Sequence, residues 1–151
     1  MKTISAALLA FALATPATAQ VVGDVDVIAS FLENYGLPVE KTVDPDGDPK
    51  LDSRIEGTRF SVYFYGCETG AVCDSLQFST GFDLEQPMSL EQVNEWNRAK
   101  RYGKVYVDED GDPYFEYDVN LDFDGIGAKN FDDTIDVWRA VLAEFRDYID
   151  W

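Results

Sequence analysis

Residues 58–83 have the sequence TRFSVYFYGCETGAVCDSLQFSTGFD, and this stretch decides the fold. In two runs, Thr58–Cys67 and Cys73–Asp83, apolar and polar residues alternate, and a short polar turn separates the runs. Because successive side chains of a strand point to opposite faces, this alternation predicts an antiparallel β-hairpin at the centre of a larger sheet. Its core face would carry Phe60, Val62, Phe64, Leu76, Phe78 and Phe82, and its polar face Arg59, Ser61, Tyr63, Tyr65, Ser75, Gln77, Ser79 and Gly81.

The two cysteines of the sequence, Cys67 and Cys73, lie at the mouth of this hairpin and enclose Glu68–Val72. Facing positions of an antiparallel pair have Cα separations that suit a disulfide, so we predict a structural Cys67–Cys73 disulfide. A redox pair or a metal site is the alternative. However, the C-x5-C spacing differs from the C-x-x-C of redox proteins, and the sequence has no histidine or third cysteine to complete a zinc site.

The N-terminal residues 1–19 have the pattern of a secretory signal peptide. Lys2 supplies a positive charge, and the apolar run Ile4–Ala14 is too short to cross a bilayer. An A-x-A motif then predicts cleavage between Ala19 and Gln20. An uncleaved N-terminal anchor is the alternative. We therefore expect a periplasmic or secreted bacterial protein, without membrane insertion once the signal is removed.

The remaining residues, 20–151, suffice for a single domain with its own core. The full sequence has 29 Asp and Glu against 12 Lys and Arg, a net charge of −17. Loss of Lys2 with the signal makes this 11 minus 29, or −18. Such a surface repels nucleic-acid phosphates and anionic lipids, so we expect cationic or neutral partners and no nucleic acid. Acidity that serves solubility alone is the alternative.

The sequence contains no histidine. Its absence excludes Ser-His-Asp and Cys-His catalysis and nearly all zinc sites. Any general acid or base would have to be a carboxylate, a tyrosine or a lysine. Glu116 and Asp118 alternate on the outward face of a predicted strand and are the acid pair that a small carboxylate-dependent hydrolase would use. We expect no enzymatic activity and no cofactor, with such a hydrolase as the alternative.

Two aspartate-rich turns, at 44–49 (DPDGDP) and 108–113 (DEDGDP), resemble the start of a calcium-binding loop. An EF-hand loop needs glycine at its sixth position and glutamate at its twelfth, and neither stretch has them. We therefore predict hairpin turns and no metal site. Weak calcium binding by Asp108, Asp110 and Asp112 is the alternative.

Two segments outside the hairpin have the helical spacing of apolar residues. The first is Asp24–Tyr35, with aspartates in its first turn. The second is 89–101 (SLEQVNEWNRAKR), which begins with the capping-box pattern S-L-E-Q. Lys100 and Arg101 are expected in its last turn, where the helix dipole favours positive charge.

A third helix is predicted from an N-cap at Asn130 to the C-terminus. Its apolar stripe comprises Phe131, Ile135, Trp138, Leu142, Phe145 and Ile149. The stripe is expected to cover the sheet. A helix–helix seam in a homodimer is the alternative.

Four further strands are predicted, at 38–44, 50–56, 104–108 and 113–121. Consecutive strands joined by short turns form an antiparallel sheet. The predicted element order is α-β-β-β-β-α-β-β-α, because the helices interrupt the strands rather than follow each of them. The fold class is therefore α+β and not a doubly wound parallel sheet.

Five segments match a known pattern: 62–67 (VYFYGC), Cys73, 76–78 (LQF), 93–98 (VNEWNR) and 110–113 (DGDP). Together they resemble the YbjN family over about Asp24–Trp151. That family is labelled as a bacterial sensory transduction regulator and is grouped by fold with the type III secretion chaperones. The resemblance implies an α+β domain whose relatives bind polypeptides, often as dimers, and it implies no catalytic residues. An exported chain departs from the cytoplasmic chaperones of this fold.

The polar face of the central hairpin is the predicted surface for a protein partner. Tyrosine combines apolar area with a polar tip and is enriched at interfaces. A helix that covers this face, so that its tyrosines belong to the core, is the alternative. The candidate partner-binding residues are Tyr63, Tyr65, Gln77, Asn94, Trp96 and Asn97.

Within the 93–98 run, Asn94, Glu95 and Asn97 are also candidates for a polar catalytic cluster, and a structural role is the favoured interpretation. Trp96 is expected to pack inward, and the asparagines to bond to neighbouring loops. For the whole chain we predict an exported, non-enzymatic binding or adaptor domain, chaperone-like or regulatory. A hydrolase, or an envelope protein with no defined ligand, is the alternative.

Overall fold

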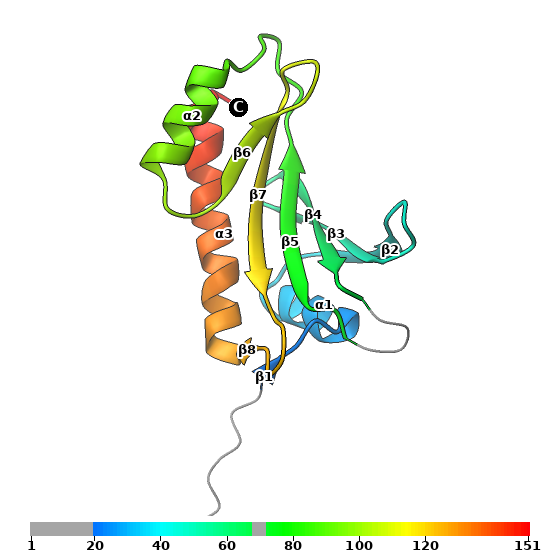
Figure 1. Cartoon of the computed structure of the whole chain (residues 1–151). Helices are drawn as coiled ribbons and strands as arrows, with labels where there is room; N and C mark the ends of the chain where they lie inside the picture. The colour runs from blue at the N-terminus through cyan, green and yellow to red at the C-terminus, as the bar shows by residue number, and fades with distance from the viewer. Residues whose placement is uncertain (1–19, 68–71) are drawn as a thin grey trace, which may run out of the picture.

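The computed structural model describes residues 20–67 and 72–151 (Figure 1). The predicted signal peptide at 1–19 lies outside the described residues, as do residues 68–71 of the predicted turn between the two central strands. Among the described helices, none combines the length and the apolar character that a membrane crossing requires.

The described part of the chain contains three helices and eight strands. The helices are α1 (Val25–Asn34), α2 (Leu90–Ala99) and α3 (Ala128–Tyr148). The strands are β1 (Gln20–Val21), β2 (Val39–Val43), β3 (Pro49–Ile55), β4 (Thr58–Tyr65), β5 (Ser75–Gly81), β6 (Lys104–Val107), β7 (Pro113–Asn120) and β8 (Ile126–Gly127). Apart from the two-residue strands β1 and β8, which were not predicted, this is the predicted order, and the α+β class is confirmed.

Six strands form one antiparallel sheet in the order β2-β3-β4-β5-β7-β6. The predicted hairpin, β4 with β5, occupies its centre. Val62 pairs with Phe78 on the core side, and Tyr63 pairs with Gln77 on the other, so the predicted division of the two faces is confirmed. The strands β1 and β8 form a separate antiparallel pair.

The core lies between the apolar face of this sheet and the helices, with α3 running along the sheet (Figure 1). The ring of Trp138 lies 5.5 Å from that of Phe78 and 5.6 Å from that of Phe60, between centroids. Burial of each such side chain stabilises the fold by roughly 1.5–3 kcal/mol. The α3 stripe covers its own sheet, as predicted: Phe131, Ile135, Trp138, Leu142 and Phe145 are at most 1% exposed, and Ile149 packs against them.

The first two helices begin at side-chain caps. The carboxylate of Asp24 accepts hydrogen bonds from the amides of Asp26 and Val27, at 2.9 and 3.0 Å. For α2, the predicted capping box is confirmed: the Ser89 hydroxyl accepts from the Gln92 amide at 3.3 Å, and the Gln92 side chain accepts from the Ser89 amide at 2.9 Å. These caps satisfy amides that have no partner inside the helix.

Two predicted helix ends were wrong. Helix α3 begins at Ala128 with Gly127 as its N-cap, because β8 pairs with β1 as far as Gly127 and the helix follows at once. Asn130 therefore lies inside the first turn. The second error concerns the end of α2. This helix ends at Ala99, and Lys100 is a C-cap with an extended backbone, so Lys100 and Arg101 lie beyond the last turn.

The predicted disulfide between Cys67 and Cys73 is present, with a Cα–Cα distance of 4.1 Å. It lies at the loop end of the β4–β5 hairpin, beyond the register pair Tyr65–Ser75. Cys73 also forms an isolated antiparallel bridge with Gly23, just before α1. Through this backbone bridge, the disulfide-bonded end of the hairpin contacts the N-terminal segment of the described chain.

Candidate functional site

The face of the sheet that points away from the core, here called the outer face, is open to solvent. Tyr65 of β4 is 44% exposed and Tyr106 of β6 is 43% exposed, while Tyr63 and Tyr114 are half-buried. These tyrosines alternate with buried residues such as Phe64 along the same strands. The alternative that a helix buries them in the core is therefore wrong.

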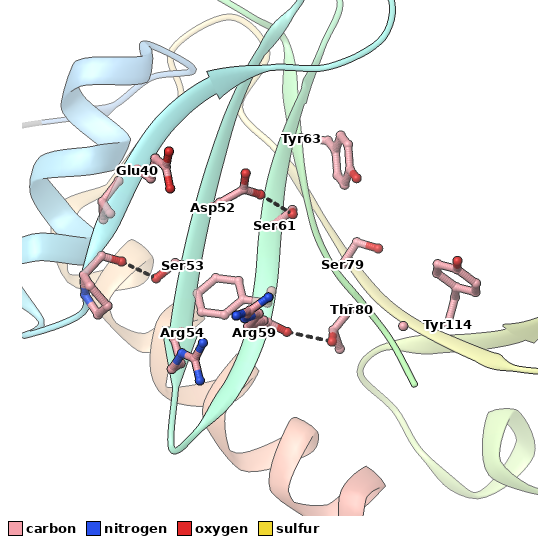
Figure 2. A pocket seen from close by; sticks show the side chains of 14 residues that line it. Glu40, Asp52, Ser53, Arg54, Arg59, Ser61, Tyr63, Ser79, Thr80 and Tyr114 are labelled. Carbon is pink, nitrogen blue, oxygen red and sulfur yellow. Dashed lines mark hydrogen bonds between the residues drawn. The ribbon is translucent and has the colours of Figure 1, made fainter. Parts of the chain in front are cut away.

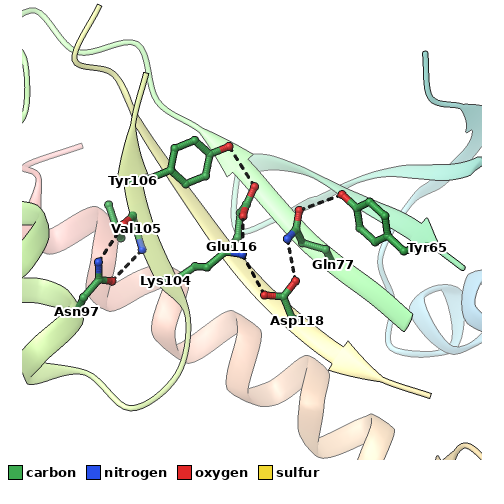
Figure 3. A network of polar contacts seen from close by, with 8 residues as sticks. All are labelled: Tyr65, Gln77, Asn97, Lys104, Val105, Tyr106, Glu116 and Asp118. Carbon is green, nitrogen blue, oxygen red and sulfur yellow. Dashed lines mark hydrogen bonds and ion pairs between the residues drawn. The ribbon is translucent and has the colours of Figure 1, made fainter. Parts of the chain in front are cut away.

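Six side chains of the outer face form a chain of contacts across four strands, here called the polar network (Figure 3): Tyr65, Gln77, Asp118, Lys104, Glu116 and Tyr106. The Tyr65 hydroxyl donates to Gln77 Oε1 at 3.3 Å. Gln77 Nε2 donates in turn to Asp118 Oδ1 at 2.7 Å. Strand register brings them together, because Gln77 and Asp118 are direct partners in the β5–β7 ladder.

Lys104 connects the two carboxylates of the network. Its Nζ lies 3.2 Å from Glu116 Oε2 and 3.2 Å from Asp118 Oδ2. The Tyr106 hydroxyl donates to Glu116 Oε1 at 3.1 Å. Glu116 is only 8% exposed although it points away from the core. A carboxylate that is so well buried requires such partners, because an unpaired buried charge is strongly destabilising.

The phenols of the network hold their protons more tightly than free tyrosine. Burial, the charge of Glu116 and the hydrogen bond to Glu116 raise the pKa of Tyr106 from 10.0 to about 12. Burial and then the Glu116 charge also raise the pKa of Tyr65. For Lys104, burial lowers the pKa, but hydrogen bonds to Asp118 and Glu116 outweigh it and the net shift is upward. At neutral pH these groups are therefore hydrogen-bond donors and not proton acceptors.

Beside the polar network, the outer face contains an open hollow of about 740 Å³ (Figure 2). Its floor consists of small residues: Ser61 and Ser79 face each other across the β4–β5 ladder, and Gly81 follows on β5. Tyr63 and Tyr114 also border it. The other lining residues are Pro38, Val39, Glu40, Asp52, Ser53, Arg54, Arg59, Phe60 and Thr80.

Tyr114 links the hollow to the network. Its ring covers Gly81, where an added Cβ would lie 3.0 Å from the ring. The same ring stacks on Tyr106, with centroids 5.3 Å apart and planes 9° apart. A side chain at Gly81 would displace Tyr114, so the glycine lets the ring lie flat along the sheet.

The structure brings together three of the predicted site residues. Tyr65 and Gln77 belong to the polar network, and Tyr63, the register partner of Gln77, borders the hollow. Their outward positions follow from the alternation of the hairpin sequence. Whether they bind a partner remains a prediction.

The other three predicted site residues are on α2, which contributes nothing to the polar network. Trp96 is 2% exposed and packs against Phe115 and Phe145, so its assignment to a partner-binding surface was wrong, and the inward packing is confirmed. The Asn97 side chain donates to the carbonyl of Val105 and accepts from its amide, both at 2.9 Å. Asn97 thus fixes α2 to β6, and Asn94 is exposed on the same helix.

Lys104 and the burial of Glu116 were not predicted from the sequence. Lys104 is the register partner of Glu116 in the β6–β7 hairpin. Counting outward from the 108–113 turn would have paired these two residues and indicated an ion pair. From the alternation of the strand alone, Glu116 was predicted to be exposed.

The two aspartate turns are hairpin turns, as predicted. The Asp44 carboxylate accepts from the amides of Asp46 and Asp48, both at 2.9 Å. The Asp108 carboxylate accepts from the amides of Asp110 and Asp112, both at 3.0 Å. Local bonds of this kind hold the turn without a cation. Within 20–67 and 72–151, no group of three or more acidic, cysteine or histidine side chains is arranged to hold a metal ion.

A search of curated proteins finds no match for this chain. A comparison with family models does find one. The model of the YbjN family, described as "Putative bacterial sensory transduction regulator", matches residues 24–151, which is the span over which the sequence motifs suggested a resemblance. The match covers the whole six-stranded sheet and all three described helices. The chain therefore belongs to the YbjN family.

Proposed function

We propose that this protein is an exported, non-enzymatic binding or adaptor domain that recognises a protein partner through the outer face of its sheet. The observation that carries the proposal is the solvent-exposed polar network with Tyr65 and Tyr106 on its surface. The family description as a regulator supports a non-enzymatic role.

The chemistry of the outer face suits a polypeptide ligand. Tyrosines present apolar rings and a hydroxyl donor with little loss of side-chain entropy on binding. Hydrogen bonds and ion pairs within the network hold these side chains before any partner arrives. Such preorganisation reduces the entropic penalty of association.

The hydrolase alternative finds little support at the candidate acid pair. Glu116 and Asp118 both contact the same Lys104 ammonium, 3.2 Å away in each case. A hydrolytic pair divides its roles between a proton donor and a base or nucleophile. Here both carboxylates are instead engaged by one ammonium group and by side-chain donors, Tyr106 for Glu116 and Gln77 for Asp118.

Export is supported by two features. The 1–19 segment has signal-peptide character in sequence. The Cys67–Cys73 disulfide suits an oxidising compartment.

The test is affinity capture from the cell envelope of the source bacterium, with quantitative mass spectrometry. Wild-type protein is compared with a Tyr65→Ser/Tyr106→Ser double variant and with Phe123→Ser. Phe123 is a matched control, since it is a 92% exposed aromatic residue outside the outer-face strands. We expect the same proteins with wild type and Phe123→Ser, and at least about tenfold less with the double variant, because interface tyrosines are frequent hot spots. Recovery that does not depend on the tyrosines, or no reproducible protein at all, would contradict the proposal.

A further inference from the structure

Two arginines meet across the β3–β4 hairpin at the border of the hollow. Arg54 and Arg59 are direct register partners, and both side chains are exposed (Figure 2). Like charges directly opposite each other in a ladder are unfavourable. In a chain with 29 acidic and only 12 basic residues, such a pair is unexpected unless something else compensates for it.

Neither arginine is neutralised within the described residues. The ion pairs found in 20–67 and 72–151 involve Lys41, Lys50, Lys100, Lys104 and Arg139. The Arg54 guanidinium makes one long hydrogen bond, 3.4 Å to the carbonyl of Gly57. Nearly all the donor capacity of the two guanidinium groups is therefore available to a ligand.

Three further donors border the same hollow: the hydroxyls of Ser79, Tyr63 and Tyr114. Among the hydrogen bonds of the described residues, none uses these hydroxyls. The neighbouring Ser61 differs, because its hydroxyl donates to Asp52 at 2.6 Å. Unused donors in the same hollow as an arginine pair favour an anionic ligand.

The acidic neighbours limit how much negative charge such a ligand carries. Glu40 and Asp52 line the hollow too, and Asp52–Ser61 is the next outward register pair after Arg54–Arg59 (Figure 2). Asp52 is partly neutralised by Lys50, 3.1 Å away. A phosphate dianion would be repelled by these groups and by the net charge of −17 more strongly than a single carboxylate. A carboxylate also matches the guanidinium fork in a bidentate geometry.

We propose that Arg54 and Arg59 bind a carboxylate of the protein partner, carried by an acidic side chain that enters the hollow. That the carboxylate belongs to a polypeptide rests on the proposed function. The hollow, at about 740 Å³, is much larger than a carboxylate alone and accommodates the flanking chain between Tyr63 and Tyr114. Although this protein is acidic overall, the site would therefore prefer an acidic residue of the partner.

The probe is a blocked peptide, acetyl-Ser-Tyr-Glu-Tyr-Ser-amide, titrated into the isotope-labelled protein and followed by amide NMR shifts. The matched probe has glutamine in place of glutamate. We expect shifts at Arg54, Arg59 and Ser79, and binding about tenfold or more weaker for the glutamine peptide, since a hydrogen-bonded charge pair is lost. Acetate is expected to bind at the same amides, more weakly than the peptide.

The matched variants are Arg54→Gln/Arg59→Gln and Arg98→Gln/Arg101→Gln, which change the net charge equally. Arg98 and Arg101 are exposed and lie outside the hollow. Only the first variant is expected to lose peptide binding, by about tenfold or more, with an otherwise unchanged amide spectrum. Equal binding of both peptides, an equal loss in both variants, or tighter binding of inorganic phosphate than of acetate would each overturn the carboxylate site. If acetate binds as tightly as the peptide, the inference that the carboxylate belongs to a polypeptide is wrong.

The two proposals fail in different ways. If Arg54→Gln/Arg59→Gln captures the same envelope proteins as wild type while Tyr65→Ser/Tyr106→Ser does not, the arginine site is wrong and the proposed function stands. If wild type captures no protein, the proposed function is wrong, and the peptide and acetate titrations still decide whether the arginines bind carboxylates.

Discussion

The amide of Cys73 donates a hydrogen bond to the carbonyl of Gly23, at 2.9 Å. Gly23 precedes the N-cap of α1, and Cys73 precedes the central strand β5. The approach is so close that a Cβ on Gly23 would overlap the carbonyl of Cys73. One backbone contact therefore couples the disulfide, the central hairpin and the first helix.

Gly23→Ala is expected to destabilise the protein by about 1–3 kcal/mol, since the added methyl group separates the two backbones or strains them. Urea unfolding followed by circular dichroism measures the change. Gly127→Ala is the control, because no atom lies within 4 Å of its added Cβ and its φ of −63° is ordinary for alanine. It should cost only the lower preference of alanine for an N-cap, about 0.5–1 kcal/mol. Equal effects of the two substitutions would show that the Gly23–Cys73 contact has no special importance.

The disulfide is expected to contribute about 2–3 kcal/mol, because it closes only a short loop in the unfolded chain. A Cys67→Ala/Cys73→Ala variant should lose this amount in urea unfolding. Dithiothreitol should lower the unfolding midpoint of wild type and leave the variant unchanged. Alkylation of native exported protein without reduction provides the direct check: modified thiols would contradict the structural disulfide.

The central hairpin was predictable because its signal is repeated along two whole strands. A period of two over Thr58–Tyr65 determines which side chains face the core, and a shift of one residue would expose every phenylalanine. The capping box at Ser89 was equally readable, since it depends on residues only three positions apart. Local patterns in the sequence were therefore sufficient to predict the central hairpin and the start of α2.

What the sequence did not reveal depends on contacts between distant segments. The β1–β8 pair joins Gln20 and Gly127, and two residues are too few for a recognisable period. That pair moved the start of α3 away from Asn130. Likewise, the burial of Glu116 follows from the strands on both sides of β7, and the unpaired state of Arg54 and Arg59 is visible only once the carboxylates are located.

Tyr106 should be the tyrosine that titrates near pH 12. Its pKa is raised in the fold relative to an unfolded value near 10, so the folded state holds the proton where the unfolded state loses it. The stabilising contribution is complete below about pH 10 and is lost as pH rises toward 12. Wild type should therefore lose stability more steeply over this window than Tyr106→Phe.

Absorbance titration of the phenolates, with urea unfolding at each pH, measures both effects. Glu116→Gln should lower the pKa of Tyr106, because the Glu116 charge is removed while the burial of the phenol remains. If the phenol lost in Tyr106→Phe is one that titrates near pH 10, or if the curve of Glu116→Gln equals that of wild type, the Tyr106–Glu116 contact does not form in solution.

Lys104→Met should destabilise the protein by about 1–3 kcal/mol, because it leaves the buried Glu116 without its ammonium partner. Lys41→Met is the matched control. The two lysine side chains are equally exposed, at 53% and 52%, but their carboxylate partners differ: the side chain of Glu116 is 10% exposed and that of Asp26 is 77% exposed. A solvated carboxylate loses little when its partner is removed, so the control should have a much smaller effect.

A double-mutant cycle separates the ion pair from the packing of the lysine stem. Once Glu116→Gln has removed the charge, Lys104→Met should destabilise much less than it does in wild type, and the difference in urea unfolding measures the coupling. If the two substitutions are additive, Lys104 supports β6 by packing alone. The ion pairs of Lys104 would then not hold the side chains of the outer face in place before a partner binds.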